Sequence, residues 1–376
     1  MKLDQPWLKS PAVRKVLEAV AAAGGEARFV GGCVRDALLG RTLGDFDLAT
    51  TLPPEEVMTA CRKAGCKVIP TGLKHGTITV VSSGQVFEIT TLRRDVATDG
   101  RHADVVFTDS WREDASRRDF TMNALFCDSE GNFTDYFGGI EDAKAGKVRF
   151  VGNPPTRIRE DVLRILRFFR FHAHFGKGTP DEDALHACHA LVELLPTLSA
   201  ERVRMELLKL LAAPDPAPCL RLMNEIGVFR TLDLPLTDFA RLEQVVRYTH
   251  DPLLRLWAVL ETIEEMPRKL RLSKAEAARL QALAPLPVVQ PLFRAAYRLG
   301  AETVKDVLVV TGRTVPPELE NWQRPVFPLK GEDVVALGIP RGPDLGRIMR
   351  QVEEWWVEQD FAPDRNACLS AAVGFR

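Results

Sequence analysis

Two aspartates separated by one phenylalanine follow a pair of glycines in the stretch FVGGCVRDALLGRTLGDFDLAT, residues 29 to 50. Side chains of a strand alternate between its faces, so Asp45 and Asp47 are expected to point one way while Phe46 and Leu48 point into a core. Two carboxylates held that close repel each other unless a cation lies between them. The pair therefore suggests a metal site, although a bare Asp-x-Asp is more often part of a turn.

The residues upstream favour the metal site. Phe29-Val30 is typical of the end of a buried strand, Gly31-Gly32 lets the backbone approach a ligand closely, and a helix is expected from Val34 to Leu39. Backbone N–H groups at the start of such a helix bind anions. Because Mg²⁺ is commonly held by one or two carboxylates together with phosphate oxygens, the stretch predicts a cradle for a metal-bound nucleoside triphosphate.

Two further charged groups follow along the chain. Glu88, in QVFEITTLRRD, is expected on a strand antiparallel to its neighbour, where it is either a third carboxylate for two-metal chemistry or a solvent-facing side chain. The segment DASRRDFTMNAL places Arg117, Arg118 and Asp119 directly before an apolar run that contains Asn123. A lone Arg-Arg-Asp is ordinarily a solvated helix start. Whether it indicates a functional site therefore depends on its place in the sequence.

One helix is expected from Thr156 to Ala173. Asp161, Arg164, Arg167 and Arg170 recur every three residues and would share one face of it. A solvated charged face is the usual role of such a pattern. A carboxylate three residues before a guanidinium can also present an acceptor and a donor side by side, which is how side chains read the edges of bases.

The elements around these residues change in kind near residue 150. Helices at 11–24 and 53–66 and strands at 67–71, 76–83, 85–92 and 103–107 predict an α+β region with a mixed, largely antiparallel sheet. Ser83-Gly84 is expected to be a hairpin turn, and the stretch from Arg93 to Ala103 a mobile loop because of its turn residues. Helical patterns dominate from about residue 155 onward, with a capping box at Ser273.

Composition limits the remaining possibilities. The 376 residues suggest two or three domains, and a net charge of -1 means that any nucleic acid must meet a local basic surface. The seven cysteines are scattered without Cys-x-x-Cys spacing, which favours reduced thiols in the cytoplasm over a zinc site. No signal peptide, membrane segment or membrane role is expected.

Several motifs together resemble one family. FVGGCVRDALLG, DFDLAT, FEITTLRRD, RRDFTMNAL, REDVLRILR and AERVRMELLKLL resemble, in order and spacing, the class II tRNA nucleotidyltransferases (CCA-adding enzymes) and the related bacterial poly(A) polymerases. The similarity is dense from residue 29 to about 211, and LKGEDVVALGIPRGPDLGRIM resembles that family's C-terminal region. The resemblance implies a polymerase-β-like nucleotidyltransferase head at residues 1–150, a helical neck that selects the base at 151–212, and a helical body and tail that bind tRNA at 213–376.

The resemblance also implies roles for individual residues. The metal-binding catalytic carboxylates would be Asp45 and Asp47, with Glu88 as a third. The residues that bind the nucleotide would be Gly32 and Arg35 in the triphosphate cradle, Arg118 and Asp119 in the Arg-Arg-Asp motif, Asp161 and Arg164 as the pair that reads the base, and Arg167 and Arg170 as further contacts.

The implied reaction is the addition of CCA to the 3′ end of tRNA without a nucleic-acid template. Two Mg²⁺ ions would activate the tRNA 3′-hydroxyl and stabilise the leaving pyrophosphate, with CTP and then ATP as the nucleotides. The implied macromolecular partner is tRNA, held by its 3′ end and its acceptor and T arms. The enzyme would act as a monomer or a weak dimer.

Alternatives remain open at this stage. A poly(A) polymerase adding AMP to RNA 3′ ends is the nearest rival, but an additional basic tail is typical of it and is not expected here. Enzymes restricted to CC or A addition form a second rival, and the loop at Arg93–Ala103 favours complete CCA addition. Intact Asp45 and Asp47 argue against an inactive tRNA-binding protein. His250-Asp251 lacks the further ligands of a metal-dependent phosphohydrolase and is expected to be a helix start, and the other histidines are expected to be packed or on the surface.

Overall fold

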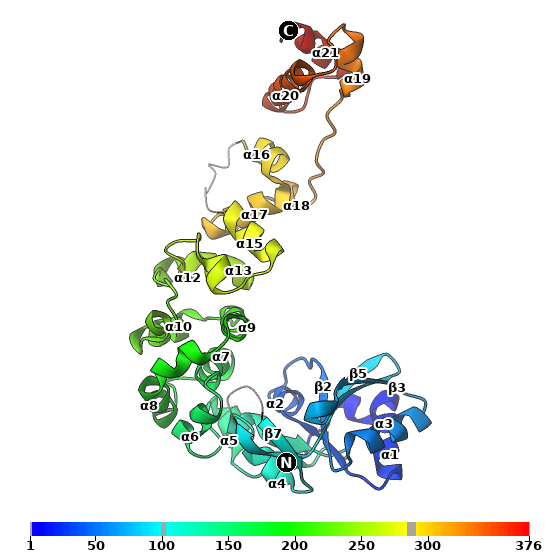
Figure 1. Cartoon of the computed structure of the whole chain (residues 1–376), viewed down its shortest axis with the longest axis vertical. Helices are drawn as coiled ribbons and strands as arrows, with labels where there is room; N and C mark the ends of the chain where they lie inside the picture. The colour runs from blue at the N-terminus through cyan, green and yellow to red at the C-terminus, as the bar shows by residue number, and fades with distance from the viewer. Residues whose placement is uncertain (1, 99–102, 284–290, 376) are drawn as a thin grey trace. The chain divides into compact units, whose positions relative to one another are not determined.

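The computed structural model describes residues 2–98, 103–283 and 291–375. The chain forms two compact units, Met1–Leu234 and Pro235–Arg376 (Figure 1). The centre of the expected loop, residues 99–102, lies outside the described residues. Among the residues that are described, no helix is both long enough and apolar enough to cross a membrane.

The first unit begins with a mixed sheet of seven strands in the order β3-β4-β5-β2-β1-β8-β9, and β6 and β7 form a separate two-stranded sheet. The strands are β1 (Ala27–Val30), β2 (Phe46–Thr50), β3 (Lys67–Gly72), β4 (Thr77–Ser82), β5 (Gln85–Thr91), β6 (Arg93–Thr98), β7 (Ala103–Phe107), β8 (Leu125–Cys127) and β9 (Phe133–Asp135). The predicted α+β class is confirmed.

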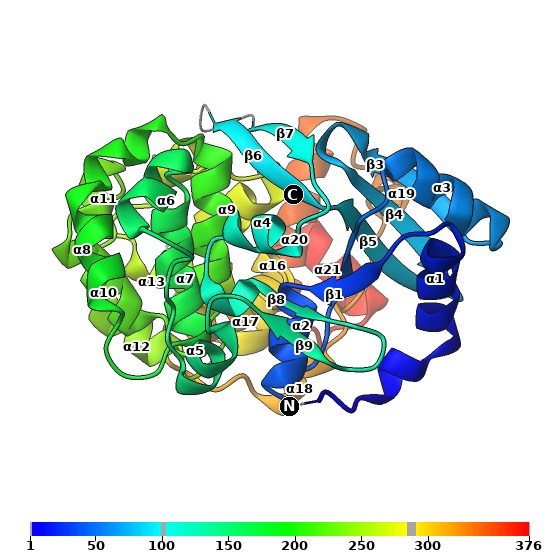
Figure 2. The same cartoon turned by 90° about the horizontal axis from the view of Figure 1, so that it is seen from below.

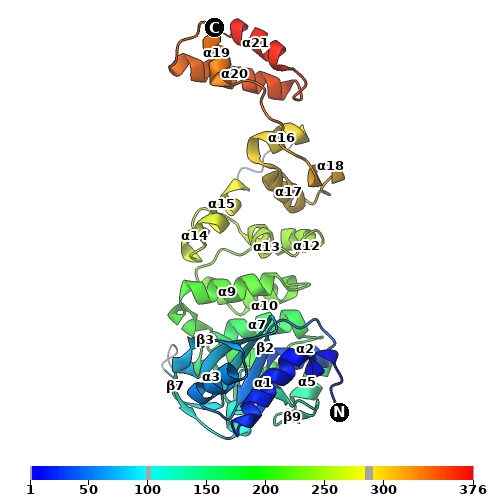
Figure 3. The same ribbon diagram turned by 90° about the vertical axis from the view of Figure 1, so that its right-hand side faces the viewer.

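Helices cover the sheet and then continue beyond it. Those of the first unit are α1 (Pro11–Ala22), α2 (Gly32–Leu38), α3 (Pro54–Lys63), α4 (Trp111–Ser116), α5 (Gly139–Ala145), α6 (Pro154–Glu160), α7 (Arg164–Phe175), α8 (Glu182–Ala190), α9 (Ala200–Leu211), α10 (Ala217–Glu225) and α11 (Val228–Thr231). Figure 3 shows α1 and α3 side by side, and Val13, Val16 and Val20 form the buried stripe of α1 because they recur at helical spacing. Their core includes Phe29 and Phe46 from the strands.

Helices are the main elements of the second unit in its described residues, and an isolated antiparallel bridge joins Leu236 to Leu260. Its helices are α12 (Phe239–Val245), α13 (Pro252–Val259), α14 (Met266–Lys269), α15 (Lys274–Ala282), α16 (Leu292–Leu299), α17 (Ala301–Val310), α18 (Pro317–Glu320), α19 (Gly331–Ala336), α20 (Pro343–Glu358) and α21 (Arg365–Gly374). The Ser273 capping box is confirmed. Asp251 caps the start of α13 and forms an ion pair with Arg279, so the interpretation of His250-Asp251 as a helix start is confirmed as well.

One expectation about the strands is confirmed and another is wrong. Glu88 lies on β5, which is antiparallel to β4 through the expected Ser83-Gly84 turn but parallel to its other neighbour, β2. A two-residue turn can join only antiparallel strands, whereas the β2–β5 pair is separated by α3, β3 and β4. The strand expected at 103–107 is confirmed as β7, but residues 93–98 of the expected loop form β6 and pair with it as an antiparallel ladder.

The prediction of one continuous helix from Thr156 to Ala173 is also wrong, because the segment forms two helices, α6 and α7. Asp161 stands between α6 and α7 in an extended conformation, with φ -151° and ψ 104°. Its carbonyl accepts a hydrogen bond from Arg164 N, and its carboxylate accepts one from Leu163 N at 3.1 Å. Asp competes in this way for backbone N–H groups and is therefore favoured at helix ends over helix interiors.

We predict that Gly139→Ala destabilises the first unit by about 1–3 kcal/mol, the usual cost of overpacking. A Cβ at this position, the first residue of α5, would lie 2.0 Å from the carbonyl oxygen of Thr121. Gly44→Ala is the matched control, because its Cβ would meet no atom within 4 Å. Urea unfolding of both variants measures the difference, and equal stabilities would contradict the predicted close contact.

Candidate active site

The aspartate pair lies at the start of β2. Phe46 and Leu48 are buried and Asp47 is half-buried on the opposite face, as the alternation predicts. Asp45 immediately precedes the strand and is exposed. Glu88 is exposed on β5 and stands directly beside Asp47 in the β2–β5 register. Burial, reinforced by the charge of Glu88, raises the pKa of Asp47 to about 6.

A cavity of about 550 Å³ brings most of the predicted site residues together. Its lining is Gly31, Gly32, Arg35, Asp47, Arg118, Asp119, Asn123, Asp161, Leu163, Arg164, Arg167, Phe171 and Arg202. Of the predicted residues, Asp45, Glu88 and Arg170 are outside this lining, and Asp45 instead borders a neighbouring cavity of about 600 Å³. A larger groove of about 940 Å³ between α1 and α3 contains none of the predicted residues.

The glycines and α2 form one wall of this cavity. Gly31 caps α2 with φ 72°, a conformation that favours glycine, and a Cβ there would lie 3.3 Å from Nη1 of Arg118. The buried Arg35 guanidinium donates to both carboxylate oxygens of Asp36, at 3.0 and 3.1 Å, and to Oδ1 of Asn123. Burial lowers the pKa of Arg35, and its partners hold the guanidinium in place. This wall therefore offers backbone and a fixed cation to an anionic ligand.

The Arg-Arg-Asp motif forms the next wall. Asp114, which is 1% exposed, accepts hydrogen bonds from Arg117 and Arg118. Asp119 accepts from Asn123 Nδ2 at 3.0 Å and from Nε of Arg167 at 2.8 Å. Burial alone would raise the pKa of Asp119. Arg167 and the Asn123 amide nevertheless hold this pKa below its usual value. Asp119 therefore joins this motif to α7 as a carboxylate.

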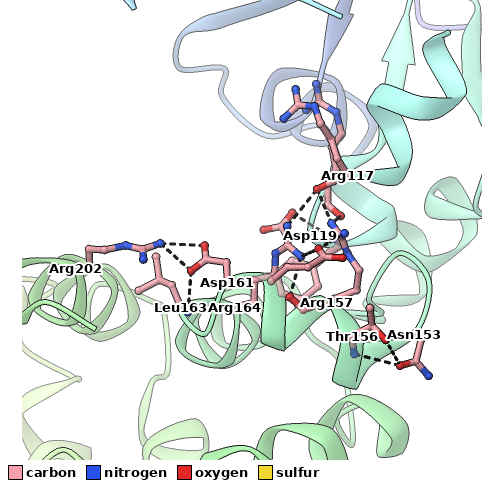
Figure 4. A network of polar contacts seen from close by, with 12 residues as sticks. Arg117, Asp119, Asn153, Thr156, Arg157, Asp161, Leu163, Arg164 and Arg202 are labelled. Carbon is pink, nitrogen blue, oxygen red and sulfur yellow. Dashed lines mark hydrogen bonds and ion pairs between the residues drawn. The ribbon is translucent and has the colours of Figure 1, made fainter. Parts of the chain in front are cut away.

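The break between α6 and α7 shapes the opposite wall (Figure 4). Both carboxylate oxygens of Asp161 lie 2.9 Å from Nη2 of Arg202 on α9. Nη1 of Arg164 donates to Arg157 O and Glu160 Oε2, and its Nη2 donates to Arg117 O. The prediction that Asp161 and Arg164 share one face of a single helix is thus wrong. Both side chains nevertheless line the same cavity.

The arginines of α7 are held by a carboxylate that sequence reasoning left without a role. Glu206 on α9 is 1% exposed; its Oε2 lies 2.6 Å from Nε of Arg170, and its Oε1 lies 3.8 Å from Nη1 of Arg167. Within unit 1, α7 lies among the green helices α6, α8, α9 and α10 in Figure 2. Arg170 therefore faces a protein carboxylate in this structure.

Comparisons with known proteins point to one family. A model described as "Poly A polymerase head domain" matches residues 27–149, and one described as "Probable RNA and SrmB- binding site of polymerase A" matches residues 179–238. The CCA-adding enzyme of Geobacillus thermodenitrificans is 44% identical over 385 residues, covering 90% of this chain and 91% of that protein. Mitochondrial CCA tRNA nucleotidyltransferase 1 of Mus musculus is 34% identical over 400 residues, covering 98% and 92%. The chain belongs to the CCA tRNA nucleotidyltransferase family.

A solved structure supports the same assignment. The crystal structure of the Bacillus stearothermophilus CCA-adding enzyme in complex with CTP is 32% identical to this chain, with a TM-score of 0.76, and the match covers 93% of this chain and 94% of that one. The fold of this chain is thus that of the family, with a polymerase-type head followed by helices.

Divalent metal ions are general in nucleotidyl transfer, and the carboxylates of the head fit one. Burial and, next to it, the charges of Glu88 and Asp45 raise the pKa of Asp47, so a cation beside this half-buried group would be favoured. Among the residues that the structure describes, no group of three or more His, Cys, Asp or Glu side chains is arranged as a metal site. Mg²⁺ commonly uses one or two protein carboxylates with water and phosphate oxygens, so such a site does not require a cluster of three protein ligands.

Sequence reasoning missed several residues that hold the side chains of this cavity in place. Arg202 and Glu206 lie one helical turn apart on α9, so both reach α7 and the α6–α7 break. The sequence signal for them was the four-residue spacing of Arg202 and Glu206 in AERVRMELLKLL, which places both on one face of a helix. Asn123, which was noted without a role, links Arg35 to Asp119.

We predict that Asp47→Asn raises the stability of the metal-free protein at pH 8. The folded pKa of about 6 exceeds the unfolded value of 3.8, so stability is highest below about pH 4 and falls as pH rises through 6. The difference, about 3 kcal/mol at pH 8 by this linkage, should vanish below pH 4. Thermal unfolding as a function of pH measures it. Millimolar Mg²⁺ should stabilise the wild type more than Asp47→Asn, and a pH-independent difference would contradict the account.

Proposed function

We propose that this protein adds CCA to the 3′ end of tRNA, using CTP and ATP without a nucleic-acid template. The observation that carries the proposal is the single cavity that joins Asp47 and a set of arginines to the Asp161 carboxylate. A nucleotide placed there has its phosphates at the cationic wall and its base at Asp161. This arrangement lies in a member of the CCA tRNA nucleotidyltransferase family.

Each wall then has its own task. Gly32 and Arg35 cradle the triphosphate, and Arg118 adds a cation beside Gly31. Asp119 orients Arg167 and contacts the nucleotide, and Arg170 is a further nucleotide or primer contact through α7. Holding the α-phosphate and the tRNA 3′-hydroxyl together lowers the barrier for in-line attack, with pyrophosphate leaving.

Asp45 and Asp47 are proposed to hold Mg²⁺, with Glu88 as a third carboxylate beside Asp47. When bound, such an ion supplies activation of the attacking hydroxyl and neutralises charge on the leaving phosphates. The protein's contribution is to hold the two aspartates close to the α-phosphate. Burial raises the pKa of Asp47 to about 6 in the metal-free protein, and a bound cation would lower that pKa again because it favours the charged carboxylate.

Base selection is proposed to depend on Asp161 as a hydrogen-bond acceptor, with Arg164 as its donor partner. Cytosine presents an N4 amino group and adenine an N6 amino group, whereas uracil presents a carbonyl oxygen in the same position. A carboxylate that is held as an acceptor therefore favours C and A. A base that leaves buried polar groups unpaired is rejected.

The remaining parts of the proposal concern the chain as a whole. We assign the head to residues 1–150, the neck to 151–212, and the body and tail to 213–376, where the acceptor and T arms of tRNA would bind. The compact units divide at Leu234 instead, so part of the body folds with the neck. Seven free, buried cysteines favour a reducing compartment such as the cytoplasm. A monomer or weak dimer is proposed.

The test is the product formed on a tRNA that lacks its 3′ CCA. CTP alone should add two residues, ATP alone none, and both together CCA. A run of adenylates with ATP alone would identify a poly(A) polymerase, and arrest after CC with both nucleotides would identify a CC-adding enzyme. Asp45→Ala and Asp47→Ala should abolish addition while tRNA binding in a gel shift stays within about twofold, because these carboxylates hold metal rather than RNA.

We predict that Asp161→Ala loses base discrimination more than it loses chemistry. A lost base contact costs about 1–3 kcal/mol, so misincorporation of UTP or GTP should rise by about one to two powers of ten. Incorporation of each of the four nucleotides by wild type and variant measures this. A uniform loss of rate with an unchanged preference for CTP and ATP would mean that Asp161 serves the α6–α7 turn alone.

A further inference from the structure

One aromatic ring is shared by three of the arginines assigned to the nucleotide. The guanidinium carbons of Arg35, Arg167 and Arg170 lie 5.3, 5.3 and 4.5 Å from the ring centre of Phe171. All three distances are within the range in which a cation is attracted to the face of a ring. Phe171 is 6% exposed and lines the 550 Å³ cavity.

The ring connects two different parts of the chain. Arg35 belongs to α2 in the head, whereas Arg167 and Arg170 belong to α7. A second ring extends the contact, because Phe175 lies 4.0 Å from the guanidinium carbon of Arg35 and 4.3 Å from that of Arg41. Nη2 of Arg41 also donates to His174 O at 2.7 Å. The end of α7 is thus held against α2 and the residues that follow it.

The chemistry of the ring suits this position. Carboxylates such as Asp119 and Glu206 also hold these arginines, but each carboxylate adds a negative charge that opposes an anionic ligand. A phenyl ring attracts guanidinium groups without a net charge. It can therefore orient several cations and leave their charge available to phosphates, and cations oriented in advance lose less freedom when the ligand binds.

We propose that Phe171 is a positioning residue that orients Arg35 and Arg167, which line the cavity, toward the nucleotide triphosphate, and so couples the phosphate cradle to the helix beside the base. Arg170 contacts the same ring but is held outside the cavity lining by Glu206. This inference rests on the proposed function of the cavity. The burial of Phe171 alone would be explained by packing. The inference assigns the ring a second role in addition to packing.

The chain offers a matched control on the same helix. Phe168 is 0% exposed and lies three residues earlier on α7, where its ring contacts those of Phe150, Phe169 and His172. Phe168→Leu therefore removes a buried ring from α7 away from the three guanidinium groups. Phe171→Tyr is the conservative variant, because it keeps the aromatic face.

The experiment is calorimetric titration of the full chain with CTP in the presence of Mg²⁺, and separately with CMP. Phe171→Leu should weaken CTP binding about tenfold and CMP binding less than twofold, because CMP lacks the β- and γ-phosphates. Phe171→Tyr and Phe168→Leu should keep CTP affinity within about twofold of wild type. If Phe171→Leu fails to fold, Phe175→Leu at a half-buried position should weaken CTP binding about threefold.

Three results would overturn the inference: unchanged CTP affinity in the folded leucine variants, equal losses for CTP and CMP, or an equal loss in Phe168→Leu. The titration uses no tRNA. A wild type that binds CTP but extends no tRNA would therefore refute the proposed function and leave the role of Phe171 standing.

Discussion

The site depends on one buried ion pair, between Asp119 and Arg167. Asp119 ends the Arg-Arg-Asp motif of the head, and Arg167 stands on the first turn of α7. The carboxylate is almost fully buried, so its charge is tolerable only because the guanidinium and the Asn123 amide satisfy it. This pair ties the Arg-Arg-Asp wall of the cavity to α7, and removing Arg167 would leave the Asp119 carboxylate buried without its cation.

The break before α7 depends on the same junction. Arg157 and Arg164 donate to the backbone carbonyls of Arg117 and Arg118, so both sides of the break are tied to the Arg-Arg-Asp segment. Asp161 stands in the gap as an acceptor and is oriented by Arg202. A continuous helix would have carried Asp161 in its hydrogen-bonded interior. The extended residue instead turns its carboxylate toward the cavity that α2 and α9 also line.

Sequence patterns located the short-range parts of this site well. The alternation of Phe46, Asp47 and Leu48, the Gly31-Gly32 turn and the Ser83-Gly84 hairpin each depend on neighbouring residues, and the structure agrees with them. Asp45 precedes the strand and borders a neighbouring cavity, so its expected pairing with Asp47 stays a prediction. The parallel pairing of β2 with β5 was missed because it joins strands that are separated by a helix and a hairpin. The break at Asp161 was missed because the apolar spacing runs on through both helices, and an aspartate that ends a helix looks the same in sequence as one on its surface.

The residues that position the site's arginines and Asp161 could not be assigned from the sequence alone. Arg202 and Glu206 lie some 40 positions from the residues they hold, and nothing in their local pattern names a partner. Phe171 reads as an ordinary core residue until the arginines around it are located. Family resemblance supplied the identities of the residues that would touch the nucleotide, whereas the structure supplied the contacts that position them.

The central claim is that Asp119 and Arg167 act as one unit in nucleotide binding. A double-mutant cycle with Asp119→Asn, Arg167→Gln and the double variant, read as the free energy of CTP binding, tests it most directly. The account predicts a coupling energy of about 1–3 kcal/mol, with the double variant little worse than either single one. Losses that add to within about 0.5 kcal/mol would show that the two side chains act independently and would contradict it.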